Sequence, residues 1–157
     1  MFKKILLAVD GSDNSNRAIR ETIEIQKKFN SEVIAFHSVE HQMIPKVIPL
    51  GYPFGGATVY TIPYSDYESI RREHIHRGET ILKDAIKVFK EAELQVETRL
   101  VEEYHPEEYI KDVIEKEKFD LVVLGCKGHH SKLKRVFLGT TATKVINESP
   151  CNVLVVR

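Results

Sequence analysis

Several features that mark other protein classes are absent or scarce in this chain of 157 residues. Two cysteines cannot build the disulfide framework of a small secreted domain. Basic and acidic residues number 23 each, so there is no basic excess to favour nucleic acid or a membrane surface as partner. No apolar run is long enough to cross a bilayer, and the run after Lys3-Lys4 ends already at Asp10, which favours a buried strand over a signal peptide. We therefore expect a cytoplasmic protein.

Recognisable catalytic and metal motifs are also missing. The chain contains neither the Walker phosphate loop nor the G-x-G-x-x-G fingerprint of dinucleotide sites. No nucleophile, base and orienting group are arranged as in a hydrolase, and no carboxylates are paired, so we assign no catalytic residue. The histidines lack recognisable ligand spacing, which argues against a metal held directly by side chains.

What is present is the alternation of apolar strands and amphipathic helices. Hydrophobic residues make up 42% and charged residues 29%, an ordinary globular composition that suits one domain over residues 1–157. The pattern predicts an α/β fold, a doubly wound, open, parallel five-stranded sheet of order 3-2-1-4-5, Rossmann-like, with helices on both faces. We place strands at 5–9, 33–39, 95–101, 119–124 and 153–156, and helices from about 12 to 29, 69 to 92, 106 onward and 140 to 147.

One stretch breaks the alternation. Residues 43–66 contain four prolines, three glycines and several tyrosines, a density that predicts a long loop without helix or strand. A loop of this length is usually disordered or functional. Disorder, an ordered flap and a partner-binding loop therefore all remain open.

The two strand ends that meet where the winding reverses carry residues suited to a ligand. Asp10 ends the first strand, and Gly125 and Gly128 follow the fourth. Gly139 and Thr140 then open a short helix, whose free amides and positive dipole end attract anions. Glycines without side chains let backbone N–H groups approach a ligand closely. Together these segments predict an anion cradle at the switch point, with phosphate as the commonest ligand.

These residues resemble the nucleotide-binding signature of the universal stress protein family. The resemblance lies in Gly125-Cys126-Lys127-Gly128 followed by Gly139-Thr140, in the opening Lys3 to Ser12 and in the closing Ser149 to Val156, and it runs through the whole chain in order. It is closest to the ATP-binding subgroup. Ten residues separate Gly128 from Gly139, where that subgroup has nine, a difference that a loop can absorb.

The resemblance implies which residues contact a nucleotide. The base would lie against Ala8 and the backbone of Ser38, and Asp10 would accept hydrogen bonds from a ribose or help to position a metal. Thr140 Oγ1 would contact a terminal phosphate, and Mg²⁺ would be held through the phosphates of ATP, with AMP or ADP as other ligands. The expected contact residues are Ala8, Val9, Asp10, Ser38, Gly125, Cys126, Lys127, Gly128, His129, His130, Ser131, Gly139, Thr140, Thr141 and Ala142.

Each of these residues also has a purely structural interpretation. Asp10 is also suited to the turn that caps the first helix, and the glycines to turns and close packing. Cys126 beside Lys127 suggests a redox role, although a small buried side chain is the better interpretation. The position of Tyr104, which borders the same cleft, is usually glycine in the family, so that loop is expected to differ in shape.

The family's last strand pairs with its copy in a second subunit, so the apolar edge strand Val153 to Val156 predicts a homodimer. The resemblance thus implies an ATP-binding stress-response switch or sensor. A partner-binding module of the same fold, working through residues 43–66 without nucleotide, and a slow ATPase or nucleotidyl transferase are the alternatives.

Overall fold

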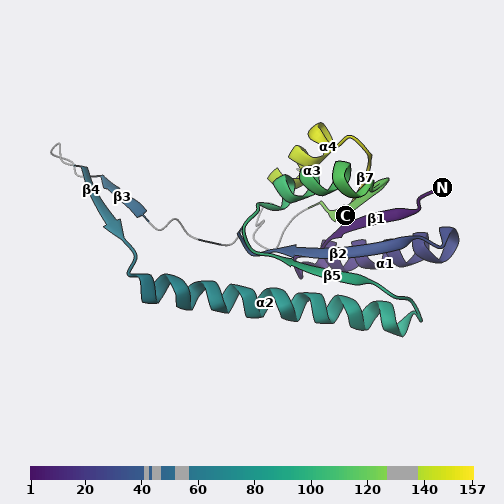
Figure 1. Cartoon of the computed structure of the whole chain (residues 1–157), viewed down its shortest axis with the longest axis horizontal. Coiled ribbons are helices and arrows are strands. Elements are labelled where there is room, and N and C mark those ends of the chain that lie inside the picture. The colour runs from purple at the N-terminus through teal and green to yellow at the C-terminus, as the bar shows by residue number, and fades with distance from the viewer. Residues whose placement is uncertain (41–42, 44–46, 52–56, 127–137) are drawn as a thin grey trace.

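The computed structural model describes residues 1–40, 43, 47–51, 57–126 and 138–157. Its main body is a five-stranded sheet built from β1 (Lys4–Ala8), β2 (Glu32–Ser38), β5 (Glu97–Val101), β6 (Leu121–Gly125) and β7 (Asn152–Val156). Four helices connect or follow these strands, as Figure 1 shows: α1 (Asp13–Phe29), α2 (Tyr64–Glu91), α3 (Pro106–Glu117) and α4 (Thr140–Glu148).

All pairings in this sheet are parallel, and the strand order is β5-β2-β1-β6-β7. Counting only these five strands along the chain, the order is 3-2-1-4-5, so the predicted doubly wound fold is confirmed. β1 lies at the centre, with Ile5 opposite Val33 of β2 on one side and Leu121 of β6 on the other. The winding therefore reverses between β1 and β6, and a ligand crevice is expected outside their carboxyl ends.

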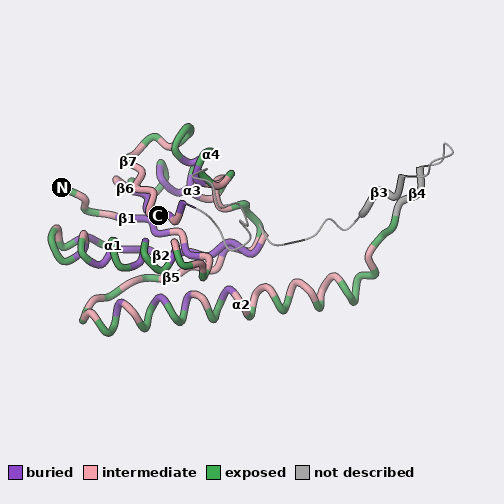
Figure 2. The backbone as a smooth tube through the Cα atoms, turned by 180° about the vertical axis from the view of Figure 1, so that it is seen from behind, coloured by how far each residue is buried: buried purple, intermediate pink, exposed green. Residues whose placement is uncertain are grey.

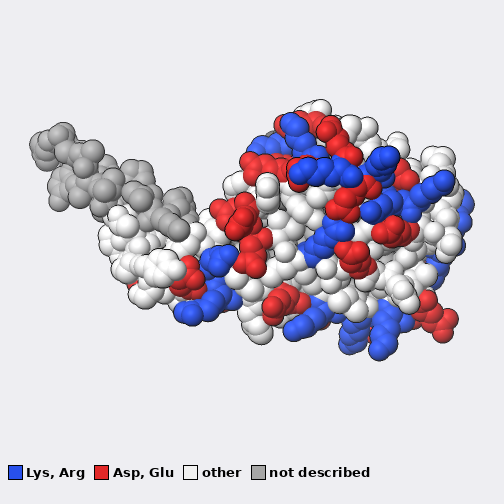
Figure 3. All heavy atoms as spheres, in the orientation of Figure 1, with Lys and Arg blue, Asp and Glu red and all other residues white. Residues whose placement is uncertain are grey.

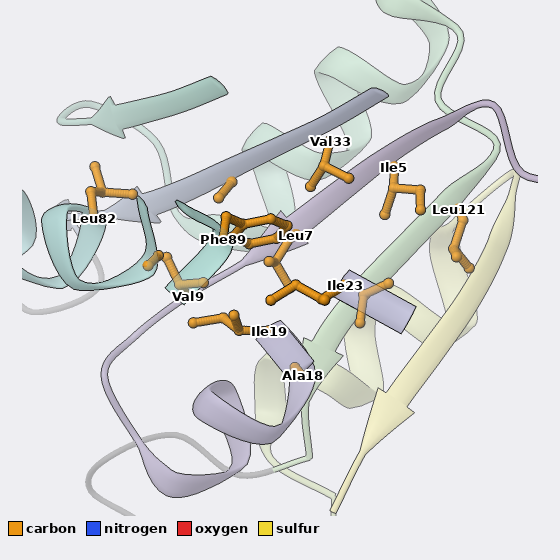
Figure 4. Close-up of a cluster of buried hydrophobic side chains, with 13 residues drawn as sticks. Ile5, Leu7, Val9, Ala18, Ile19, Ile23, Val33, Leu82, Phe89 and Leu121 are labelled. Carbon is orange, nitrogen blue, oxygen red and sulfur yellow. The ribbon is translucent and has the colours of Figure 1, made fainter. Parts of the chain in front are cut away.

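Each face of the sheet carries one hydrophobic core, because successive residues of a strand point to opposite faces. Ile5 and Leu7 of β1, and Val9 directly after it, belong to the cluster that α1 and α2 cover, which Figure 4 shows in close-up. Leu6, between them in sequence, joins the second cluster, which α3 and α4 cover. A strand that is buried on both faces has a continuous run of apolar residues, which explains why β1 and β6 lack polar alternation.

The prediction of a loop without strands over residues 43–66 was wrong. β3 (Val47–Gly51) and β4 (Ala57–Thr61) form a separate antiparallel sheet beyond the amino end of α2, away from the main sheet (Figures 1 and 2). Pro49 stands inside β3, opposite Val59. A two-stranded sheet consists only of edge strands, and an edge strand accepts proline where no pairing amide is needed. Residues 41–42, 44–46 and 52–56 lie outside the described residues.

The second helix also begins earlier than expected. α2 starts at Tyr64, with Pro63 as its N-cap, whereas the apolar stripe had placed its start at residue 69. Residues 64–68 contain neither proline nor glycine, and Asp66 in the first turn complements the helix dipole. Among the described residues, no helix is long and apolar enough to span a membrane.

Candidate functional site

The candidate site lies at the carboxyl ends of β1 and β6, where the turn from β1 into α1 begins. Asp10 is the centre of that turn. Its carboxylate Oδ1 accepts a hydrogen bond from the Ser12 amide at 2.9 Å, and its own amide donates to Ser15 Oγ at 3.1 Å. Gly11 has a φ of 77°, a left-handed conformation that glycine adopts without strain. One Asp10 oxygen therefore performs the turn role that the sequence allowed, and the turn holds the carboxylate at the strand end.

Ser12 is the N-cap of α1. Its Oγ accepts from the Ser15 amide at 3.2 Å, which satisfies one of the helix's first N–H groups. Ser15 is therefore bound through both its amide and its hydroxyl, and it joins the strand end to the first turn of the helix. The start of α1 and the end of β1 thus form one hydrogen-bonded unit.

Gly125, the last residue of β6, packs closely against this unit. A Cβ atom on Gly125 would lie 2.9 Å from the Ser15 amide nitrogen and 3.0 Å from the carbonyl carbon of Asn14. Both are backbone atoms, so no change of side-chain rotamer could make room. The close approach of α1 is therefore a sufficient reason for glycine at this position, which supports the packing interpretation of Gly125.

Cys126 joins β6 to α4. Its amide donates to the Val156 carbonyl at 2.7 Å, and its carbonyl accepts from the Gly139 amide at 2.8 Å. The thiol is only 6% exposed, and its sulfur accepts from Asn14 Nδ2 at 3.6 Å, as expected for a small buried side chain. The bond from Gly139 places the amino end of α4 beside the carboxyl end of β6, although twelve residues separate Cys126 from Gly139 in sequence.

The amino end of α4 differs from those of the other three helices. α1, α2 and α3 each carry at least one acidic residue in the first turn, whereas α4 carries none. Its N-cap is Gly139, which has no side chain to bind the first amides. Thr140 is exposed, Thr141 is partly exposed and Ala142 is buried. The positive end of this helix dipole is therefore not neutralised by the helix's own first turn.

On the other side of β1, Ser38 ends β2. Its side chain is buried, and Oγ donates to the Tyr104 carbonyl at 2.5 Å. This bond ties the end of β2 to the loop between β5 and α3, where the family resemblance predicts a different shape. Tyr104 is not among the residues with positive φ, so the loop does not require glycine there. Ala8, at the end of β1, is partly exposed beside this position.

The described residues bring together ten of the fifteen predicted contact residues at the carboxyl edge of the sheet. The other five, Lys127, Gly128, His129, His130 and Ser131, lie outside the described residues. Within the part of the chain that is described, no group of three or more His, Cys, Asp and Glu side chains is placed to hold a metal ion. Sequence reasoning missed the roles of Asn14 and His37, which contact Cys126 and Val9. Both contacts join segments that are far apart in sequence, so predicting them would have required the relative positions of the strands and of α1.

The family of the chain follows from comparison with known proteins. The sequence model of the universal stress protein family matches residues 1–55 and 54–157. The chain belongs to the universal stress protein family. A universal stress protein of Methanocaldococcus jannaschii is 34% identical over the whole chain and 83% of its own length. One from Thermus aquaticus is 31% identical, with full coverage of both chains.

Solved universal stress proteins share the fold. The protein UspA from Lactobacillus plantarum superposes with a TM-score of 0.74 at 24% identity, covering 99% of this chain and 98% of its own. The Archaeoglobus fulgidus protein was solved in complex with dAMP, and it matches with a TM-score of 0.65 at 20% identity, covering 100% and 98%. Solved members also include one in complex with cAMP and one from Arabidopsis thaliana with AMP bound, with TM-scores of 0.65 and 0.61.

Proposed function

We propose that this universal stress protein binds an adenine nucleotide, with ATP as the principal ligand, and acts as a nucleotide-dependent switch or sensor. The observation that carries the proposal is the meeting of two helix starts at one strand end. The amino end of α1 packs against Gly125, and that of α4 is bound to Cys126. Backbone amides at helix starts are the usual ligands of phosphate groups. Family members solved with AMP, dAMP and cAMP support the same class of ligand.

In this proposal the three parts of a nucleotide occupy neighbouring positions along the edge. The base lies near Ala8 and Ser38, the ribose near Asp10 and the phosphates near Gly139 and Thr140. Gly128 and the residues after it would complete the phosphate contacts. Mg²⁺ would be held between the phosphates, since the described residues provide no side-chain metal site. Acid and base charges are mixed on the face shown in Figure 3, so this face has no extended basic surface of the kind that nucleic acid requires.

Thermal unfolding with AMP, ADP and ATP, each with and without Mg²⁺, tests the proposal. A ligand present at a hundred times its Kd stabilises the folded state by about 2.7 kcal/mol. For a chain of this size, that corresponds to a rise in Tm of about 5–10 °C. No rise with any of these nucleotides at millimolar concentration would refute nucleotide binding.

Two matched threonine variants on α4 test where the phosphates lie. Thr140→Ala removes the hydroxyl expected on a terminal phosphate and should reduce the shift that ATP produces. Thr143→Ala is the control, because Thr143 Oγ1 already donates to the Gly139 carbonyl at 3.0 Å within the helix. Equal shifts in the two variants would contradict the placement of the phosphates at Thr140.

Slow ATP hydrolysis in the same cleft is the enzymatic alternative. Separation of nucleotides by chromatography after long incubation with MgATP measures it directly. Release of ADP that Thr140→Ala abolishes would favour that alternative over a site that only holds the nucleotide.

The proposed assembly is a homodimer through β7. This strand is one of the two edge strands of the main sheet. Its four apolar residues, Val153, Leu154, Val155 and Val156, are all partly exposed. An apolar edge strand left open to solvent promotes aggregation, and pairing with a second copy removes the edge. Analytical ultracentrifugation over a range of concentrations tests this, and a monomer throughout would refute it.

The β3–β4 hairpin favours a partner-binding role as the second candidate function. Residues 47–65 contain no charged side chain, and Tyr60 and Tyr64 are 51% and 75% exposed. An isolated two-stranded sheet is only marginally stable in water, so a partner protein would stabilise it. Deletion of residues 47–61 should leave nucleotide binding intact and abolish capture of such a partner.

A further inference from the structure

The ring of His37 lies directly behind the turn that carries Asp10. His37 is on β2 and only 2% exposed, and its Nδ1 lies 2.7 Å from the Val9 carbonyl oxygen. A carbonyl oxygen only accepts, so Nδ1 carries the proton in this contact. Val9 directly follows β1 and is also tied to β2, since its amide donates to the Phe36 carbonyl at 2.9 Å. His37 therefore binds the chain at the point where it leaves the sheet toward Asp10.

Helix α2 holds this ring in place from the other side. A Cβ atom on Gly78 of α2 would lie 2.7 Å from His37 Cδ2 and 2.6 Å from Leu100 Cδ1. Glycine inside a helix lowers helix stability relative to alanine, so its presence in α2 needs a reason. The space that the His37 ring and the Leu100 side chain occupy supplies that reason.

The same face of α2 also supports the turn itself. A Cβ atom on Gly11 would lie 3.2 Å from Ile81 Cγ1, and Ile81 follows Gly78 by three positions, which places both on one side of the helix. The turn is thus held at three points: by Ile81 behind Gly11, by His37 at the Val9 carbonyl, and by the hydrogen bonds of Asp10 within the turn.

We propose that His37 is a positioning residue of the nucleotide site, and that Gly78 sets the position of its ring. This inference rests on the proposed function. A buried carbonyl that loses its donor turns toward another partner, usually water. Such a rotation at Val9 displaces Ala8 and Asp10, on which the base and the ribose are expected to lie. His37 acts through these neighbours and has no contact with the nucleotide itself.

Two substitutions separate the hydrogen bond from the bulk of the ring. His37→Leu removes the donor and keeps an apolar side chain of comparable length. His37→Asn keeps an N–H donor at the same number of bonds from Cα as Nδ1. We expect H37L to bind AMP and ATP about tenfold more weakly than the wild type, the effect of one lost hydrogen bond, and H37N to remain within about threefold.

Gln26→Leu is the matched control. Gln26 is buried on α1, and its Nε2 donates to the carbonyls of Ser31 and Gln95, which precede β2 and β5 at the opposite edge of the sheet. Q26L therefore also removes hydrogen bonds to buried carbonyls, but away from the site. It should lower the urea midpoint of unfolding, as H37L does, and leave both dissociation constants unchanged.

Isothermal titration calorimetry with AMP and ATP gives the affinities, and the ¹³C carbonyl shift of Val9 reports the hydrogen bond. We expect that shift to change in H37L and to stay near the wild-type value in H37N. Wild-type protein that binds neither nucleotide would refute the proposed function and this inference together. Wild-type protein that binds, with H37L equal to it, would overturn the inference alone.

If H37L does not fold, Gly78 provides the second test. Gly78→Ala places a methyl group against the ring and against Leu100 Cδ1, and it should both weaken binding of AMP and ATP and change the carbonyl shift of Val9. Unchanged affinity in G78A, or weaker binding with the Val9 shift unaltered, would overturn the inference.

Discussion

Substitution of Gly125 by alanine tests whether this glycine serves close packing. The new Cβ would lie 2.9–3.0 Å from backbone atoms of Ser15 and Asn14. The first turn of α1 would have to move by about half an ångström to restore ordinary contact, and forced shifts of this kind cost about 2 kcal/mol. Gly125 has no positive φ, so without the close contact alanine would stabilise the protein by about 0.5 kcal/mol, because it lowers the conformational entropy of the unfolded chain.

The two effects oppose each other, and the packing effect is the larger. We expect G125A to lower the free energy of unfolding by about 1.5 kcal/mol and Tm by about 3–6 °C. Urea and thermal unfolding without nucleotide measure this, and Ile86→Ala, on the exposed side of α2, is the control that should change stability by less than about 0.5 kcal/mol. The direction of the change in Tm decides the test, because an unchanged or raised Tm would show that α1 does not restrict position 125.

Two further predictions concern single interactions. Ser12→Ala removes the N-cap of α1 and should lower stability by about 1 kcal/mol in urea unfolding, and an unaltered midpoint would count against the cap. The second concerns Glu117, whose pKa the hydrogen bond from Arg99 holds below its ordinary value of 4.5, against the opposing effect of burial. A lowered pKa in the folded state gives stability that is present above pH 4.5 and is lost as pH falls through the lowered value, so Glu117→Gln should cost about 1 kcal/mol at pH 7 and much less at pH 3. The same loss at both pH values in urea unfolding would contradict the role of the carboxylate charge.

The sequence predicted the sheet well because burial on both faces leaves a direct trace in composition. β1 and β6 are continuous apolar runs, and no other common element has that pattern between amphipathic helices. The order of the strands followed from the family resemblance together with the rules for parallel crossovers. The positions of Asp10, Gly125 and Gly139 at one edge of the sheet followed in turn, since the carboxyl ends of parallel strands share an edge.

The β3–β4 hairpin could not be predicted in the same way. Prolines and glycines usually exclude strands, but that rule assumes a sheet with neighbours on both sides. Whether the strand that contains Pro49 has one neighbouring strand or two is decided only in the assembled sheet. β3 pairs with β4 alone. The early start of α2 likewise depended on Pro63 being its N-cap, whereas the apolar stripe marks only the half of the helix that covers the sheet.

The sequence by itself thus determined the layers, because periodicity and strand direction are local properties of the chain. Its family resemblance added the strand order and, with it, the edge at which a ligand is expected. Only the tertiary structure decided what each residue at that edge does. Gly125 makes room for the backbone of α1, Cys126 holds the start of α4, and His37 binds the Val9 carbonyl from behind. These contacts join residues that are far apart in sequence, and their distances depend on how closely the helices pack on the sheet.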